Sequence, residues 1–124
     1  MEVKDLIEKI REWEHDAGES FYDYFAHDRI SNVSWAFWLI GKGFKEHGNA
    51  ILEEHNKEGN TTNYVCQEEL YNIYPEYVGK NQYGDPDFSD ENYEKNLAIM
   101  AEFLLDTPIY TKRVMDWFEK QDND

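Results

Sequence analysis

The chain has 124 residues with 27 acidic and 12 basic side chains, a net charge of −15, and a length that fits a single domain over residues 1–124. This charge argues against direct binding to nucleic acid or anionic lipid, and no apolar run approaches the ~20 residues that a membrane-spanning helix needs. The single cysteine, Cys66, excludes an internal disulfide, and with no secretory signal at its start the chain is expected to be cytoplasmic.

Two helices are expected at the start of the chain. Apolar residues spaced three and four apart predict a helix over residues 2–17, and Gly18 is suited to end it. The aromatic run SFYDYF at residues 20–25 predicts a short second helix or a helical turn.

The middle of the chain allows two interpretations. A cap at Ser31–Asn32 or Ser34 followed by apolar residues favours a third helix, although the glycines at 41–43 predict a break in it. The competing interpretation takes residues 33–40 as a buried strand. Because residues 35–52 form the least charged and most aromatic stretch, we expect them at the centre of the core.

The second half of the chain predicts further helices around one long loop. A helix is expected over residues 63–74, whereas residues 75–89 lack periodicity and predict a surface loop. Another helix follows from Ser89 or Asp90, and Thr107–Pro108 begins the last one. The fold is therefore predicted to be all-α, a compact bundle of five or six helices.

Acidic residues of the first helix recur every three or four positions, which places them in a stripe opposite its apolar face. They are Asp5, Glu8, Glu12, Asp16 and Glu19. A second acidic group leads into the helix after the long loop and comprises Asp85, Asp87, Asp90, Glu91 and Glu94. Successive acids of the stripe lie about 5 Å apart along the helix axis, so the row can imitate the phosphates of a DNA strand, which recur every ~3.4 Å.

The stripe has two interpretations. It is either the solvated face of an amphipathic helix or a template that engages a cationic groove of a partner. Lys4, Lys9 and Arg11 are expected to dilute its charge, because each can pair with an acid three or four residues away. The functional interpretation is favoured because no basic element elsewhere in the chain compensates the negative charge.

In size, charge and helix content the chain resembles the small acidic helical proteins that phages and mobile elements direct against host restriction or CRISPR systems. Several of those proteins are DNA mimics. The resemblance includes no shared motif, so it implies a class of function, the anti-defence inhibitor, and assigns no residue roles.

Catalytic and metal-binding patterns are incomplete in this sequence. The pair Glu12 and His15 occurs once, whereas a carboxylate-bridged metal pair needs Glu-x-x-His on two helices. His47 is expected to face solvent or a partner. Residues 85–91 lack the glycine that a calcium loop needs at its sixth position, and Cys66 has no CxxC partner. We therefore expect no enzymatic activity, no cofactor and no bound metal.

Tyrosines gather from the fourth predicted helix into the long loop, at positions Tyr64, Tyr71, Tyr74, Tyr77 and Tyr83. If exposed, they suit a protein-binding surface with Tyr77 and Tyr83 as anchors, and if buried they serve packing. The sequence predicts a non-enzymatic acidic protein that blocks the basic nucleic-acid-binding site of a partner protein, as an anti-CRISPR, anti-restriction or nuclease immunity protein does. The alternative is a structural, adaptor or chaperone-like phage or bacterial protein that forms a homodimer through its aromatic residues.

Overall fold

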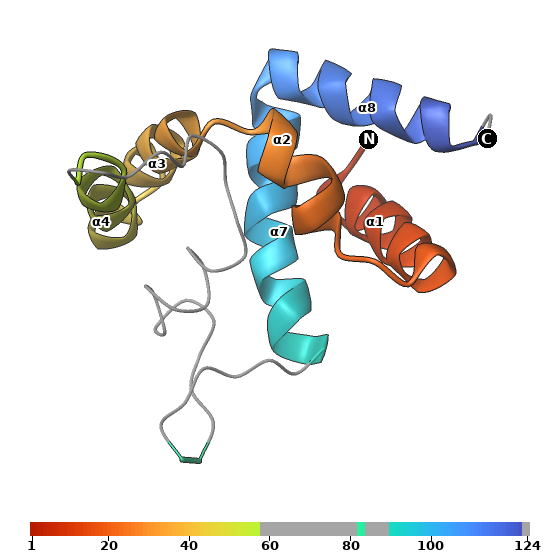
Figure 1. The fold of residues 1–124 in the computed structure, drawn as a ribbon, viewed down its shortest axis with the longest axis horizontal. Coiled ribbons are helices and arrows are strands. Elements are labelled where there is room, and N and C mark those ends of the chain that lie inside the picture. Colours follow the sequence, from red (N-terminus) through yellow and green to blue (C-terminus); the bar gives the residue numbers. More distant parts are fainter. Residues whose placement is uncertain (58–81, 84–89, 123–124) are drawn as a thin grey trace.

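The computed structural model describes residues 1–57, 82–83 and 90–122 (Figure 1). Within these ranges 83% of the residues are helical and none forms a strand, which confirms the all-α prediction. In chain order the elements are α1 (Val3–Ala17), the π-helix η1 (Tyr22–Ala26), α2 (His27–Arg29), α3 (Asn32–Gly41), α4 (Lys45–His55), α7 (Asp90–Asp106) and α8 (Pro108–Asp122).

Local signals set both ends of α1. The backbone N–H of Glu2 donates a hydrogen bond of 3.2 Å to the carboxylate of Asp5, which closes the first turn. Gly18 adopts the left-handed conformation with φ of 69°, and its N–H donates to the carbonyl of Glu14 at 2.8 Å. The predicted helix over residues 2–17 and its end at Gly18 are confirmed.

The aromatic run forms a π-helical turn, η1, that continues directly into α2. Four residues between positions 21 and 26 are fully buried, namely Phe21, Tyr22, Phe25 and Ala26. Phe21 and Phe25 stack with their ring centroids 5.0 Å apart. The short helix was predicted from its aromatic residues, but the wider hydrogen-bond pattern of a π-helix has no signature in that run.

Residues 33–40 are helical, so the buried-strand interpretation is wrong. The hydroxyl of Ser31 accepts a hydrogen bond of 3.4 Å from the N–H of Ser34 and caps the start of α3. Gly43 has a φ of 101°, a conformation that favours glycine, and the chain turns back there into α4. The predicted break at the glycines is confirmed.

Helix α7 lies between the α3–α4 hairpin and the helices α1 and α8 (Figure 1). Its fully buried residues are Leu97, Met100, Ala101 and Leu104. On the side of α7 away from the hairpin, the ring of Trp117 in α8 lies 4.8 Å from that of Trp13 and 5.8 Å from that of Phe21, measured between ring centroids. Such aromatic contacts each bury a large area, so they account for much of the packing between α1, η1 and α8.

The α3–α4 hairpin attaches to α7 through a few side chains. The ring of Phe103 lies 5.2 Å from that of Trp35 and 5.5 Å from that of Trp38. The indole N–H of Trp38 donates a 2.8 Å hydrogen bond to Asp106, and the ammonium of Lys42 lies 3.4 Å from the same carboxylate oxygen. The hydrogen bond and the positive charge both lower the pKa of Asp106.

The expectation that residues 35–52 form the centre of the core is confirmed only in part, because Trp35, Ala36, Leu39 and Ile51 belong to the buried core but the stretch is not at its centre. The hairpin lies to one side of α7 (Figure 1), and Phe37 is 61% exposed. The two helices of this stretch contact each other tightly. A Cβ at Gly48 would lie 2.5 Å from both the backbone oxygen of Ala36 and the side chain of Ile40.

His47 is buried, with only 2% of its surface exposed, so the expectation that it faces solvent or a partner is wrong. It lies one turn before Ile51, on the buried face of α4. Burial penalises the charged imidazole and lowers the pKa of His47 from 6.5 to about 3.

Several predictions fall on residues outside the described ranges. These are the helix over residues 63–74, the calcium-loop segment at 85–91 apart from its last two residues, and the loop at 75–89 apart from Gln82 and Tyr83, both of which are exposed. Cys66 also lies outside. In the described part of the chain, no helix has the length and apolar character needed to span a membrane.

Candidate partner-binding site

Helix α1 presents four of the predicted stripe acids on one exposed side, which we call the α1 acidic face: Asp5, Glu8, Glu12 and Asp16. The opposite side of the helix buries Leu6 and Ile10. With a rise of 1.5 Å per residue, the face extends about 16 Å along the helix axis. The predicted stripe is therefore a single exposed row over residues 5–16.

Two of the three basic residues of α1 contact groups outside this face. The ammonium of Lys4 lies 3.9 Å from the carboxylate of Glu2. The ammonium of Lys9 lies 5.2 Å from the centre of the Phe118 ring, in the position of a cation–π contact.

The third base, Arg11, is directed toward α7. Its guanidinium lies 3.2 Å from the carboxylate of Glu14 and 3.6 Å from that of Glu94, and it lies 5.0 Å from the centre of the Tyr93 ring. The expectation that the bases of α1 dilute the stripe is therefore wrong. Within the described ranges, no cation pairs with a carboxylate of the α1 acidic face.

Two members of the predicted stripe differ from the others. Asp5 accepts the hydrogen bond from the N–H of Glu2, so it also caps the helix on which it lies. Glu19 follows Gly18 and lies past the end of α1, so the prediction that it continues the stripe is wrong. The charge of Glu19 and its hydrogen bond raise the pKa of the Tyr24 hydroxyl, which places Glu19 beside η1 instead.

A cavity of about 420 Å³ opens between α1 and α8 at the α1 acidic face. It is lined by Lys9, Glu12, Trp13, Asp16, Ala17, Phe118 and Gln121. The aromatic rings give this cavity an apolar wall, and the two carboxylates outnumber the one cation of the lining, Lys9. A lysine or arginine side chain has the matching character, because its stem is apolar and its end is cationic.

The second predicted acidic group is only partly described. Asp90 begins α7, and Glu91 and Glu94 are exposed in its first turns. Outside the described residues lie Asp85, Asp87 and Tyr77. Glu91 pairs with Lys95 at 3.9 Å, and Glu94 pairs with Arg11 of α1. The start of α7 is therefore beside α1, but ion pairs reduce the charge that it contributes.

The aromatic surface expected from five tyrosines is represented here by Tyr83 alone, which is 78% exposed. The other four lie outside the described residues. Elsewhere the large exposed apolar side chains belong to separate elements, including Phe37 on α3 and Ile109 on α8. The dimer interface of the alternative interpretation stays a prediction.

Sequence reasoning missed Glu14, which organises the contact between α1, η1 and α7. Its side chain is only 9% exposed, and its carboxylate accepts hydrogen bonds of 2.8 Å from the N–H of Phe21 and 2.6 Å from the hydroxyl of Tyr93. Arg11 supplies a third donor at 3.2 Å. The available signal was its position, because Glu14 lies one helical repeat of seven residues after Ile7 and four after Ile10, on the apolar side of α1.

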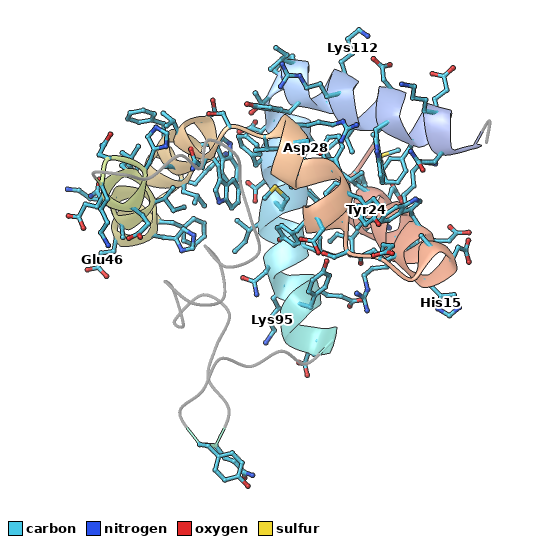
Figure 2. All side chains as sticks on the ribbon, in the orientation of Figure 1. His15, Tyr24, Asp28, Glu46, Lys95 and Lys112 are labelled. Atoms are coloured by element: carbon cyan, nitrogen blue, oxygen red, sulfur yellow. The ribbon has the colours of Figure 1, made fainter. Side chains whose placement is uncertain are left out.

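The described ranges contain no group of three histidine, cysteine, aspartate or glutamate side chains placed to hold a metal ion. His15 is exposed near the end of α1 and points outward (Figure 2). No family model, no curated protein and no solved structure matches this chain.

Proposed function

We propose that this protein is a non-enzymatic acidic inhibitor that inserts the α1 acidic face into the basic nucleic-acid-binding site of a partner protein. The observation that carries the proposal is the pairing of the basic residues of α1. Lys4, Lys9 and Arg11 all contact groups outside the face, so none of them forms an ion pair with its carboxylates. Lys9 also lines the cavity beside Glu12 and Asp16 and offsets part of their charge, whereas carboxylates that hold no ion pair keep most of their attraction for external cations.

The rigidity of α1 supports the same function. The helix is closed at both ends by Asp5 and Gly18, and its buried side is fixed against the core by Leu6 and Ile10. A row of charges on such a helix loses little conformational entropy when it binds. The cavity beside Glu12 and Asp16 adds a place where a basic side chain of the partner can enter.

The net charge of −15 contributes to the rate of association. Long-range attraction to a basic groove accelerates encounter at low ionic strength and is screened at high ionic strength. The proposal extends to a DNA-mimic mode of action against a nuclease or host-defence protein in the cytoplasm, in keeping with the absence of an internal disulfide.

The test is a charge reversal on the α1 acidic face. The triple variant Glu8→Lys, Glu12→Lys and Asp16→Lys retains every buried residue of α1, so circular dichroism should show an intact fold. A partner is first isolated from a lysate of the source organism at low salt and then purified. Displacement of a fluorescent DNA duplex from that partner by the protein measures inhibition. We expect the variant to bind at least about 100-fold more weakly, because like charges then face each other.

A matched control separates position from total charge. Three exposed acids lie on other helices: Asp28 on α2, and Glu46 and Glu53 on α4. Figure 2 labels the first two. Their reversal to lysine changes the net charge by the same amount and should leave most of the affinity. Equal losses in the two variants would mean that net charge alone acts. A partner that keeps its DNA when the protein binds would refute the proposal.

A further inference from the structure

A second cavity, of about 560 Å³, lies between α2 and α8 and gathers positive charge in this acidic chain. Its lining residues are Arg29, Arg113, Asp116, Trp117, Glu119 and Lys120. Three of the 12 basic residues of the chain thus line one cavity. In the ranges that the structure describes, none of these three cations forms an ion pair with a carboxylate.

Backbone carbonyls and aromatic rings hold the two guanidinium groups in place. Arg113 donates a hydrogen bond of 2.9 Å to the carbonyl of Arg29, and Arg29 donates one of 3.0 Å to the carbonyl of Tyr24 in η1. The guanidinium carbon of Arg29 lies 5.6 Å from the centre of the Phe25 ring, and that of Arg113 lies 5.2 Å from the centre of the Tyr110 ring. These contacts restrain the side chains without neutralising them, and each guanidinium keeps further N–H donors.

The two carboxylates in the lining differ in their effect. Asp116 pairs with Lys112 at 2.6 Å, so part of its charge is already compensated by a residue that does not line the cavity. Glu119 has no such ion pair among the described residues and opposes the binding of an anion. The three cations still outnumber the two acids on this surface.

We propose that this cavity binds a small molecule that carries a phosphate monoester on a planar or apolar body. A guanidinium presents donors in a fork that matches a phosphate, and Lys120 adds a third positive charge. The volume lies within the range of small-molecule pockets and exceeds the space that a bare phosphate fills. Trp117 is 6% exposed, so only a small part of its ring borders the cavity, and the stems of the arginine and lysine side chains add apolar surface for the remainder of the ligand.

The π-helix beside the cavity supports this assignment. Tyr24, whose carbonyl accepts the hydrogen bond from Arg29, lies within η1. Single π-helical turns are rare in proteins and are frequent at functional sites. The cavity shares no residue with the α1 acidic face, so the test of this ligand does not depend on the function proposed above.

The test uses phenyl phosphate as the probe and amide chemical shifts of the full chain as the readout. We expect saturable shifts at millimolar concentration centred on α2 and α8, with benzoate, which has the same ring and a carboxylate, binding at least several-fold more weakly. Arg113→Gln should weaken binding roughly ten-fold, because it removes a charged hydrogen-bond donor. Glu119→Gln should tighten binding, a gain that a purely structural role of the lining does not produce.

Two further variants guard against misinterpretation. Arg113 also holds the carbonyl of Arg29, so Lys120→Gln repeats the test at an exposed side chain if Arg113→Gln fails to fold. Lys45→Gln, at an exposed lysine on α4, is the control for lost charge and should bind the probe normally. The proposal is overturned if phenyl phosphate does not bind, if Lys120→Gln binds as the wild type does, or if Lys45→Gln weakens binding equally. Equal binding of benzoate would overturn the assignment to phosphate.

Discussion

Among the described glycines, Gly48 is the one where an added side chain meets other atoms of the protein. A Cβ built there lies 2.5 Å from the backbone oxygen of Ala36 and 2.5 Å from Cγ1 of Ile40, whereas ordinary contacts start near 3.4 Å. The Ile40 side chain can rotate, but the carbonyl of Ala36 belongs to α3 itself. Gly48→Ala therefore forces α3 and α4 apart by about 1 Å along their contact.

The expected change in the free energy of unfolding is the difference between two opposing effects of the Gly48→Ala substitution. Overpacking of a close contact costs about 1–3 kcal/mol, and alanine in place of glycine favours the helical conformation by about 1 kcal/mol. We expect Gly48→Ala to lower the free energy of unfolding by about 1–2 kcal/mol, because the clash involves backbone. Urea unfolding followed by circular dichroism measures this difference.

Gly41 is the matched control. It lies at the end of α3, and a Cβ there meets no atom within 4 Å. Gly41→Ala should leave stability unchanged or raise it by up to about 1 kcal/mol. If Gly48→Ala is as stable as Gly41→Ala, the close approach of the two helices described above is wrong.

Two other buried side chains, His47 and Glu14, are expected to change the free energy of unfolding by a comparable amount. Burial lowers the pKa of His47 from 6.5 to about 3, so between these values the unfolded chain holds a proton that the folded chain does not. The free energy of unfolding should therefore fall as the pH drops below 6.5, with His47 contributing about 2 kcal/mol by pH 5. Urea unfolding of the wild type and of His47→Gln at pH 7 and pH 5 isolates this contribution, and a pH-independent difference between them would contradict it. Glu14→Ala leaves three donors without their acceptor and should cost about 2–3 kcal/mol in the same assay. Glu12→Ala, at an exposed position of the same helix, should change stability by less than about 0.5 kcal/mol, and equal losses at the two positions would exclude the buried network.

Features set by neighbours in sequence were predictable. Gly18 ends α1, Ser31 caps α3 and Pro108 begins α8, because each of these residues acts through its own backbone or the next turn. The exposed row of acids on α1 followed in the same way from helical periodicity.

Features set by tertiary contact were not predictable. The sequence allowed Arg11 to pair along its own helix, but the structure pairs it also with Glu94, 83 residues later in the chain. The hydrogen bonds of the Glu14 carboxylate come from Phe21, just before η1, and from Tyr93 of α7. The spacing of residues within one helix does not reveal which side chains of other helices contact it in the folded protein.

Among the described residues, the α3–α4 hairpin contacts α7 at few positions, and this has a consequence for how the molecule opens. Its described links to α7 concentrate at Trp35, Trp38 and Lys42, whereas its own two helices contact each other closely at Gly48. Such a pair forms a cooperative unit that can detach while the remaining helices stay folded. Amide protons of α3 and α4 should then exchange with deuterium together, and ahead of those in α7.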